Sequence, residues 1–166
     1  MSYTRVTGWL DYNDTSTTST PIALVADTFA DVPNDGLGSF TNKAYPPLGV
    51  GELIDTSTGY LDFSSLRLGD VIVIRNDFTV TPQTNNSELR LRYVLGGGAG
   101  EYALTKSLGR LDRGAGIGYN FSLGVDLIYM GDTNTKGNPG KLQIELSATG
   151  TAVNNGSVIS VSRYTA

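Results

Sequence analysis

Four stretches of the sequence alternate between apolar and polar side chains with a period of two. In one of them, Leu89, Leu91 and Tyr93 alternate with Arg90 and Arg92. The four stretches are residues 70–81, 87–95, 119–130 and 141–148. Successive side chains of a β-strand point to opposite faces of its sheet, so this period predicts half-buried strands. A shift of one residue in pairing would turn the apolar side chains of such a strand to water.

Shorter stretches predict further strands, with turn-forming residues between them. These stretches are residues 5–10, 21–26, 60–63, 101–104, 151–153 and 157–163. Residues 83–86 and 154–156 are rich in Asn and Gly, which tolerate the positive φ angles of tight turns. No long window has the apolar spacing of a helix. About eight to ten short antiparallel strands predict an all-β fold, a sandwich or jelly roll.

The first third of the chain differs from the rest. Residues 11–20 are almost wholly polar, and residues 28–51 are rich in Pro and Gly. We therefore expect residues 1–51 to form an extended N-terminal arm and long loops that contribute early strands. Residues 52–166 are expected to form the jelly-roll core. With 166 residues and no internal repeat, the chain is interpreted as one domain.

The strand predicted for residues 70–81 begins with apolar side chains on both faces. Val71 and Val73 alternate with Ile72 and Ile74 there. A strand that is apolar on both sides is typical of a central position with packing on each face. We therefore predict that Val71 and Val73 contact something outside the core of one chain, such as another subunit.

Composition excludes several classes of function. The sequence contains no Cys and no His, which removes thiolate nucleophiles, disulfides, the commonest general base and the commonest transition-metal ligands. The net charge is -4, and the nearest approach to a basic cluster is Arg90 with Arg92, so nucleic acid is not an expected partner. No apolar run approaches the roughly 18 residues of a spanning helix, so no membrane is expected either. The N-terminus lacks the features of a signal peptide, which predicts synthesis in a cytoplasm.

Three motifs resemble functional sites and fail their requirements. The glycines of residues 96–100 are not followed by the Lys and helix of a phosphate-binding loop, and a turn explains them better. Residues 132–137 resemble the start of a calcium loop, but the position of its bidentate Glu is Gln143. Paired acids that could hydrolyse glycosides fall in polar turns or at strand edges, where solvated acids are the simpler interpretation. These pairs are Asp11/Asp14, Asp27/Asp31 and Asp62/Asp70. We predict no catalytic, cofactor or metal site, and hence no enzyme.

Aromatic residues near the two ends of the chain admit two interpretations. Trp9, Tyr12 and Tyr164 could be ordinary core residues. Alternatively, they could anchor terminal segments to a neighbouring chain, because aromatic anchors dominate the energetics of interfaces. With Val71 and Val73, they form our predicted set of interface residues.

Several segments resemble structural proteins of tailed bacteriophages that have the jelly-roll fold. These segments are residues 61–78 (LDFSSLRLGDVIVIRNDF), 128–135 and 158–163, and the opening with Trp9, Asp11-Tyr12 and Pro21-Ile22. The resemblance implies a tumour-necrosis-factor-like jelly roll that forms homotrimers and sits on the capsid surface of the virion. It brings no catalytic motif and no functional residue with it.

The leading functional hypothesis is a capsid decoration, or cement, protein. Such a protein would trimerise through a flat sheet face, bind the major capsid protein at local three-fold positions and stabilise the head. An alternative is a receptor- or carbohydrate-binding module of a head or tail fibre, for which Tyr45, Tyr60, Tyr102 and Tyr119 could stack on sugar rings. A third hypothesis is a glycan-degrading enzyme that uses one of the acidic pairs.

Overall fold

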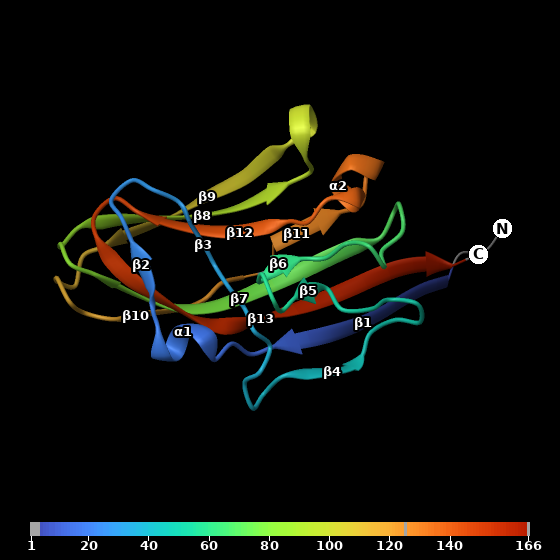
Figure 1. Ribbon diagram of the computed structural model, residues 1–166, viewed down its shortest axis with the longest axis horizontal. Helices are drawn as coiled ribbons and strands as arrows, with labels where there is room; N and C mark the ends of the chain where they lie inside the picture. Colours follow the sequence, from blue (N-terminus) through green and yellow to red (C-terminus); the bar gives the residue numbers. More distant parts are fainter. Residues whose placement is uncertain (1–3, 125, 166) are drawn as a thin grey trace.

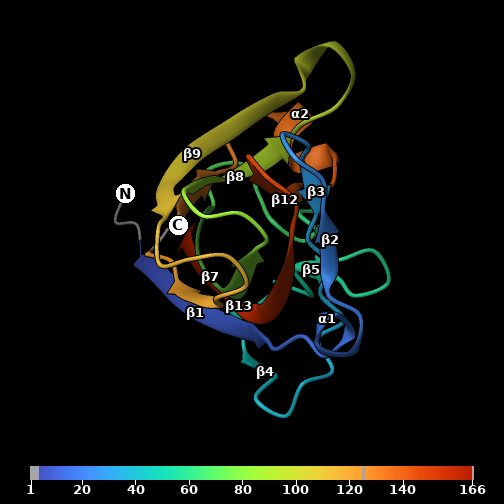
Figure 2. The ribbon, with the colours of Figure 1, turned by 90° about the vertical axis from the view of Figure 1, so that its left-hand side faces the viewer.

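Two antiparallel sheets pack face to face in the protein (Figure 1). The structure is a computed structural model that describes residues 4–124 and 126–165. The view along the long axis shows the two layers curving around a common interior (Figure 2). Two of the sequence predictions fall partly outside the described residues. They are the absence of an export signal at the N-terminus, and the place of Val125 in the stretch 119–130.

The larger sheet contains the longest strands of the molecule. Its order is β10 (Tyr119–Ser122), β7 (Val71–Pro82), β13 (Gly150–Thr165), β1 (Thr4–Tyr12) and β4 (Asn42–Tyr45). Two further strands join it at the sides, β11 (Asp126–Tyr129) on β7 and β2 (Ile22–Leu24) on β13. β10 and β11 follow each other along the same edge of β7.

The smaller sheet faces the larger one, and short elements lie at the ends. Its order is β3 (Ala30–Asp31), β12 (Lys141–Leu146), β8 (Ser87–Leu95) and β9 (Tyr102–Leu111). A separate hairpin consists of β5 (Ile54–Asp55) and β6 (Tyr60–Leu61). The short helices are α1 (Ser16–Ser19), α2 (Thr133–Gly137) and the 3₁₀ turn η1 (Gly98–Gly100).

The strand order is that of a jelly roll. Neighbours within the larger sheet, such as β1 and β13 or β7 and β13, are far apart in sequence, and so are β8 and β12 in the smaller sheet. The chain crosses repeatedly from one sheet to the other, which is the arrangement expected of two-sheet jelly rolls. The prediction of an all-β, antiparallel jelly-roll sandwich is therefore confirmed.

The two-residue periods of β7 and β8 build the centre of the core. Their inward side chains are almost fully buried and meet between the sheets: Ile72, Ile74, Phe78 and Val80 from β7, and Leu89, Leu91, Tyr93 and Leu95 from β8. Both strands match the stretches predicted from the sequence, residues 70–81 and 87–95. Apolar burial on this scale supplies the main driving force for folding.

The stretch 119–130 is not one alternating strand, as predicted, but two strands whose phases differ. Ser122 pairs with Asp77, and Asp126 pairs with Ile74, so this side advances four residues (122 to 126) while β7 advances three (77 to 74). One extra residue reverses the face to which all later side chains point. Consequently Ile128 enters the core, and Leu127 and Tyr129 point outward.

The predicted turn at residues 154–156 is instead a bulge within β13. Asn154 pairs with Phe78 and Gly156 with Asp77, so Asn155 is the extra residue. The Asn154 side chain holds the bulge, because its Oδ1 accepts the Gly156 N–H at 3.0 Å and its Nδ2 donates to the Pro33 carbonyl at 2.8 Å. The two predicted strands, 151–153 and 157–163, are thus one continuous strand.

Residues 4–12 form β1 inside the larger sheet, at the place of the strand predicted for residues 5–10. β1 pairs with β13 along its whole length, from Thr4 opposite Thr165 to Tyr12 opposite Ser157. This pairing satisfies backbone groups of β13 that would otherwise form an open edge. Residues 13–51 contribute the short elements α1 and β2 to β4, with loops between them.

A buried ion pair joins the end of β13 to the loops before β7. The side chains of Arg163 and Asp70 are 2% and 3% exposed, and Arg163 Nη2 lies 2.5 Å from Asp70 Oδ2. The guanidinium also donates to the carbonyls of Leu48 at 3.2 Å and Ser65 at 3.0 Å. The carboxylate in turn accepts the Arg67 N–H at 2.8 Å. Such complete pairing is what makes two buried charges tolerable.

Asp70→Asn tests the importance of this pair. The substitution keeps the shape of the side chain but leaves the Arg163 guanidinium buried without a counter-charge, which should lower the free energy of unfolding by about 3–5 kcal/mol. The matched control is Glu52→Gln, because Glu52 forms an exposed ion pair with Lys43 at 3.1 Å. The control should cost about 1 kcal/mol or less. Urea denaturation at a fixed protein concentration measures both, and equal losses would contradict the assignment.

Gly156→Ala tests the bulge in β13. Gly156 has φ +134°, and an added Cβ would lie 2.5 Å from the Tyr12 carbonyl oxygen. The strained φ alone should cost about 1–3 kcal/mol of stability. Gly137→Ala is the control, since its Cβ would meet no atom within 4 Å and its φ lies outside the left-handed region. Thermal unfolding should show a lower midpoint for Gly156→Ala only, and an unchanged midpoint would show that the bulge adapts freely.

Candidate interaction surface

A row of side chains that is apolar except for Ser160 crosses the outer face of the larger sheet. Trp9 on β1 pairs with Tyr45 on β4 and with Ser160 on β13. Ser160 pairs with Val73 on β7, and Val73 pairs with Leu127 on β11. Directly paired residues of antiparallel strands point to the same face, so these side chains form one continuous row. The rings of Trp9 and Tyr45 are in contact, with centroids 5.1 Å apart.

A second row lies beside the first and widens it. Thr7 pairs with Ser162, Ser162 with Val71, and Val71 with Tyr129. We call the apolar members of both rows the outer-face patch: Trp9, Tyr45, Val71, Val73, Leu127 and Tyr129. Leu127 and Tyr129 are 59% and 64% exposed, and Tyr45 is 56% exposed. Large apolar side chains gathered on one face, with only the small Ser160 and Ser162 between them, are typical of an interaction surface.

The outer-face patch continues around one edge of the sandwich. There a groove of about 410 Å³ runs between β9 and β11, beside a second hollow of about 270 Å³. Leu104, Leu127 and Ile128 line both hollows, and Tyr102 and Tyr129 line the second. Among the described residues, β9 pairs only with β8 and β11 only with β7, so each strand has a free edge facing the groove. We call this region the edge groove.

A polar network at the base of the edge groove holds β11 in place. The Lys106 ammonium lies 2.7 Å from both carboxylate oxygens of Asp126. The Tyr93 hydroxyl donates to Asp126 at 3.0 Å and accepts from Asn76 Nδ2 at 2.5 Å. Asn76 Oδ1 accepts from the Ser157 hydroxyl at 2.7 Å. Burial and the neighbouring Asp126 raise the pKa of Tyr93, so it remains a neutral donor, and the network ties both sheets together.

The outer face of the smaller sheet has the opposite character. Arg90 forms an ion pair with Glu145, and Arg92 Nε donates to Gln143 at 2.7 Å. Gln143 in turn donates to Asp31 at 2.6 Å. Polar side chains that pair with one another in this way present a polar surface to solvent and not an apolar one to a partner. The two outer faces therefore differ, and the outer face of the larger sheet is the better candidate for an interface.

Four of the five predicted interface residues lie on that outer face. Trp9 is 38% exposed and Tyr164 is 56% exposed, and Val71 and Val73 are half-buried within one chain. The prediction that Tyr12 is an interface residue is wrong, because its side chain is 0% exposed. Its hydroxyl accepts the Leu53 N–H at 2.7 Å. Burial raises the pKa of this hydroxyl. Tyr12 is a core residue because its position on β1 has the opposite parity to Trp9.

Two members of the candidate acidic pairs, which we interpreted as solvated acids, are instead buried and hydrogen-bonded within the fold. Asp14 is buried and accepts the Thr17 N–H at 2.9 Å and the Asp35 N–H at 2.9 Å. Asp70 is engaged with Arg163. Among residues 4–124 and 126–165, no group of three potential metal-ligating side chains converges. Within the same residues, no helix has the length and apolar character needed to span a bilayer.

Comparisons with known proteins found similarity in structure but not in sequence family. No family model matches the chain, and no curated protein matches its sequence. Among solved structures, the Eiger TNF from S. frugiperda is 10% identical, with a TM-score of 0.46 over 96% of this chain and 92% of that one. The PRD1 vertex protein P5 is 16% identical, with a TM-score of 0.41 over 94% of both chains. At TM-scores below 0.5, neither likeness bears on partners or assembly.

Proposed function

We propose that the chain is a structural protein of a viral particle: a capsid decoration, or cement, protein that trimerises and stabilises the head by binding the major capsid protein. The observation that carries the proposal is the outer-face patch, which is continuous with the edge groove. The sequence resemblance to phage jelly-roll proteins supports the same role. The proposal gives the chain a place in an assembly on the capsid surface and assigns it no reaction.

Self-association is supported by the shape of the apolar surface. The outer-face patch consists of paired positions on neighbouring strands, so its side chains stand side by side on one face of the sheet. The edge groove lies at its border and presents Tyr102 and Leu104, which are 41% and 44% exposed. The outer-face patch and the edge groove share Leu127 and Tyr129 but otherwise consist of different side chains. Contact between two different surfaces is head-to-tail, which closes into rings when the rotation between copies allows it. A ring of three would let the edge of each copy cover the outer-face patch of the next.

Contact with the capsid requires a surface that the trimer leaves free. The loops around β4 provide one, because Leu37, Phe40 and Leu48 are 77%, 78% and 96% exposed. These side chains lie in the Pro- and Gly-rich segment 28–51 and not on the outer-face patch. Three identical loops acting together would bind a symmetric shell with higher avidity than any one of them alone.

Leu127→Asp tests the proposed trimer. A charge in the centre of an apolar interface should raise the dissociation constant by about tenfold or more. Light scattering should give three times the 17.6 kDa chain mass for the unaltered protein and a lower mass for the variant at equal concentration. Leu37→Asp is the matched control, since Leu37 is exposed but lies on the loops. A strictly monomeric unaltered protein would contradict the proposal.

Phe40→Asp tests the proposed capsid contact. This variant should remain trimeric and should bind capsids that lack the protein about tenfold more weakly, since an exposed apolar anchor becomes charged. Cosedimentation with such capsids measures the binding, and electron microscopy of decorated capsids locates the protein. Absence of the unaltered protein from capsids under these conditions would rule out the decoration role, even if it is trimeric.

A further inference from the structure

β9 leaves a long backbone edge open at the side of the sandwich. It has ten residues and, among those that the structure describes, pairs only with β8. Its first four residues, Tyr102 to Thr105, are exposed and carry no charge. An open edge presents unpaired N–H and C=O groups with which another strand can pair. β9 of a second copy is such a strand, because two identical edges can pair antiparallel about a two-fold axis.

An extra residue interrupts the second half of this edge. Between the pairs Leu89–Gly109 and Arg90–Ser107, β9 contains one additional residue, Leu108. Gly109 has φ +99°. A bulge of this kind twists an edge out of the flat shape that strand pairing requires. The half of β9 that precedes the bulge has no such interruption.

Lys106 places a charge on the inner side of the uninterrupted half. It pairs with Leu91, which is 0% exposed, so the Lys106 side chain points to the interior and not to the outer face of the smaller sheet. Its ammonium reaches across the edge groove to Asp126 of β11, where it lies 2.7 Å from both carboxylate oxygens. The two side chains are 32% and 21% exposed. The ion pair therefore crosses the opening between two free edges and remains in contact with water.

A strand added to β9 would cover this ion pair. Directly paired residues of neighbouring strands point to the same face, so side chains of the added strand would enter the groove beside Lys106. The pair would lose its remaining contact with water. Removing two charges from water costs more free energy than their attraction returns, unless further hydrogen bonds form. Two neutral side chains at these positions would carry no such cost.

We propose that the pair of Lys106 with Asp126 prevents β9 from pairing with β9 of a second copy. An inward-pointing charge on an edge strand is one of the features by which proteins avoid edge-to-edge association. The inference does not depend on the decoration role or on the trimer, because the open edge belongs to a single chain. Within the proposed ring, the pair restricts the edge groove to contacts between side chains, so an edge meets an outer face and not another edge.

Lys106→Met/Asp126→Asn tests the inference. This double variant removes both charges, leaves the net charge at -4 and keeps an acceptor for the Tyr93 hydroxyl. Light scattering at equal concentration should give about twofold or more the mass of the unaltered protein, because copies pair along β9. Lys106→Arg retains the ion pair and should keep the mass of the unaltered protein. If the Met form does not fold, Lys106→Gln/Asp126→Asn replaces the ion pair with a hydrogen bond and should show the same rise.

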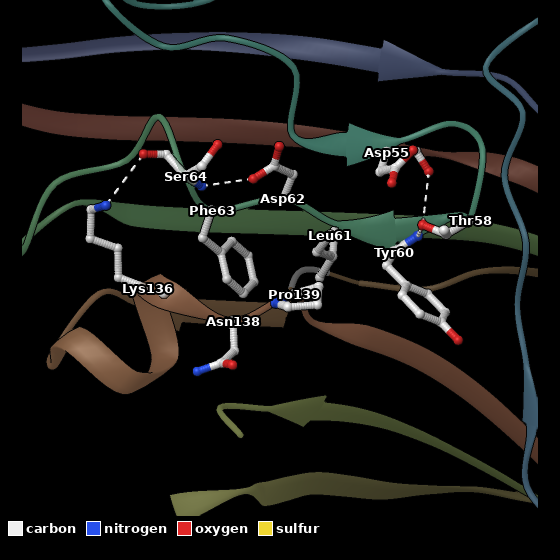
Figure 3. A pocket seen from close by; sticks show the side chains of 11 residues that line it. Asp55, Thr58, Tyr60, Leu61, Asp62, Phe63, Ser64, Lys136, Asn138 and Pro139 are labelled. Carbon is white, nitrogen blue, oxygen red and sulfur yellow. Dashed lines mark hydrogen bonds between the residues drawn. The ribbon is translucent and has the colours of Figure 1, made fainter. Parts of the chain in front are cut away.

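The matched control removes one Lys and one Asp outside the edge groove. Figure 3 shows Lys136 beside Ser64 in a pocket of about 440 Å³ between the β5–β6 hairpin and α2, with Asp62 along the same pocket. Lys136 Nζ donates to the Ser64 carbonyl at 3.3 Å, and Asp62 Oδ1 accepts the Ser64 N–H at 2.8 Å. Neither lines the edge groove. Lys136→Met/Asp62→Asn should keep the mass of the unaltered protein.

An introduced thiol shows whether the larger species is paired along β9. The chain has no Cys, so Thr105→Cys provides one thiol per copy, on the uninterrupted half of the edge. A short bismaleimide should link two copies of Thr105→Cys when Lys106→Met/Asp126→Asn is also present, and should not link them when the ion pair is intact. Urea unfolding of both forms should remain cooperative, which separates paired folded chains from aggregates of unfolded ones.

Two results would overturn the inference: a folded double variant with the mass of the unaltered protein, and equal crosslinking of Thr105→Cys with and without the ion pair. A rise in mass for the control on α2 would overturn it too, since loss of any Lys and Asp would then suffice. The mass of the unaltered protein tests the trimer separately. If that protein is monomeric, the decoration proposal fails, and a larger double variant still supports the role of the ion pair.

Discussion

The pairing register of β7 with its neighbours is the constraint on which the interaction surface depends. β7 runs without interruption, whereas β13 and the β10–β11 segment each contain one extra residue near Asp77. The extra residue on the β10–β11 side turns Leu127 and Tyr129 outward, where they lie beside Val73 and Val71 on the outer face of the sheet. Without it, both side chains would point into the core, and the outer face would lose its most exposed apolar members.

Polar interactions inside the sandwich preserve this register. The Asn154 side chain closes the bulge in β13, the network from Ser157 to Lys106 fixes β11 across both sheets, and the pair of Arg163 with Asp70 anchors the end of β13. Buried polar groups that are fully paired specify one arrangement more strictly than apolar packing does. The result is a sandwich with one polar outer face and, on the other, an apolar patch that ends at the Arg75–Asp77 ion pair. That asymmetry is the physical basis of the proposed assembly.

Much of the fold could be predicted from the sequence, because the two-residue period is uninterrupted in β7 and β8. The period fails where an extra residue enters, so the predictions for the stretch 119–130 and for residues 154–156 are wrong. A usable signal was nevertheless present: Leu127, Ile128, Tyr129 and Met130 are apolar on both faces, as Val71 to Ile74 are. Parity along β1 separates Trp9 from Tyr12, but only the pairing with β13 shows which of the two is inside. The edge groove joins residues of β9 and β11 that are distant in sequence, so no local pattern predicts it.

Trp9 is the only tryptophan of the chain and lies within the outer-face patch, so its fluorescence is the most direct test of the central claim that a second copy covers this face. The measurement is Trp9 emission and acrylamide quenching over a dilution series. Coverage predicts blue-shifted, poorly quenched emission at high concentration that changes to red-shifted, readily quenched emission as the assembly dissociates. Emission typical of an exposed indole at every concentration, including the highest, would contradict the account.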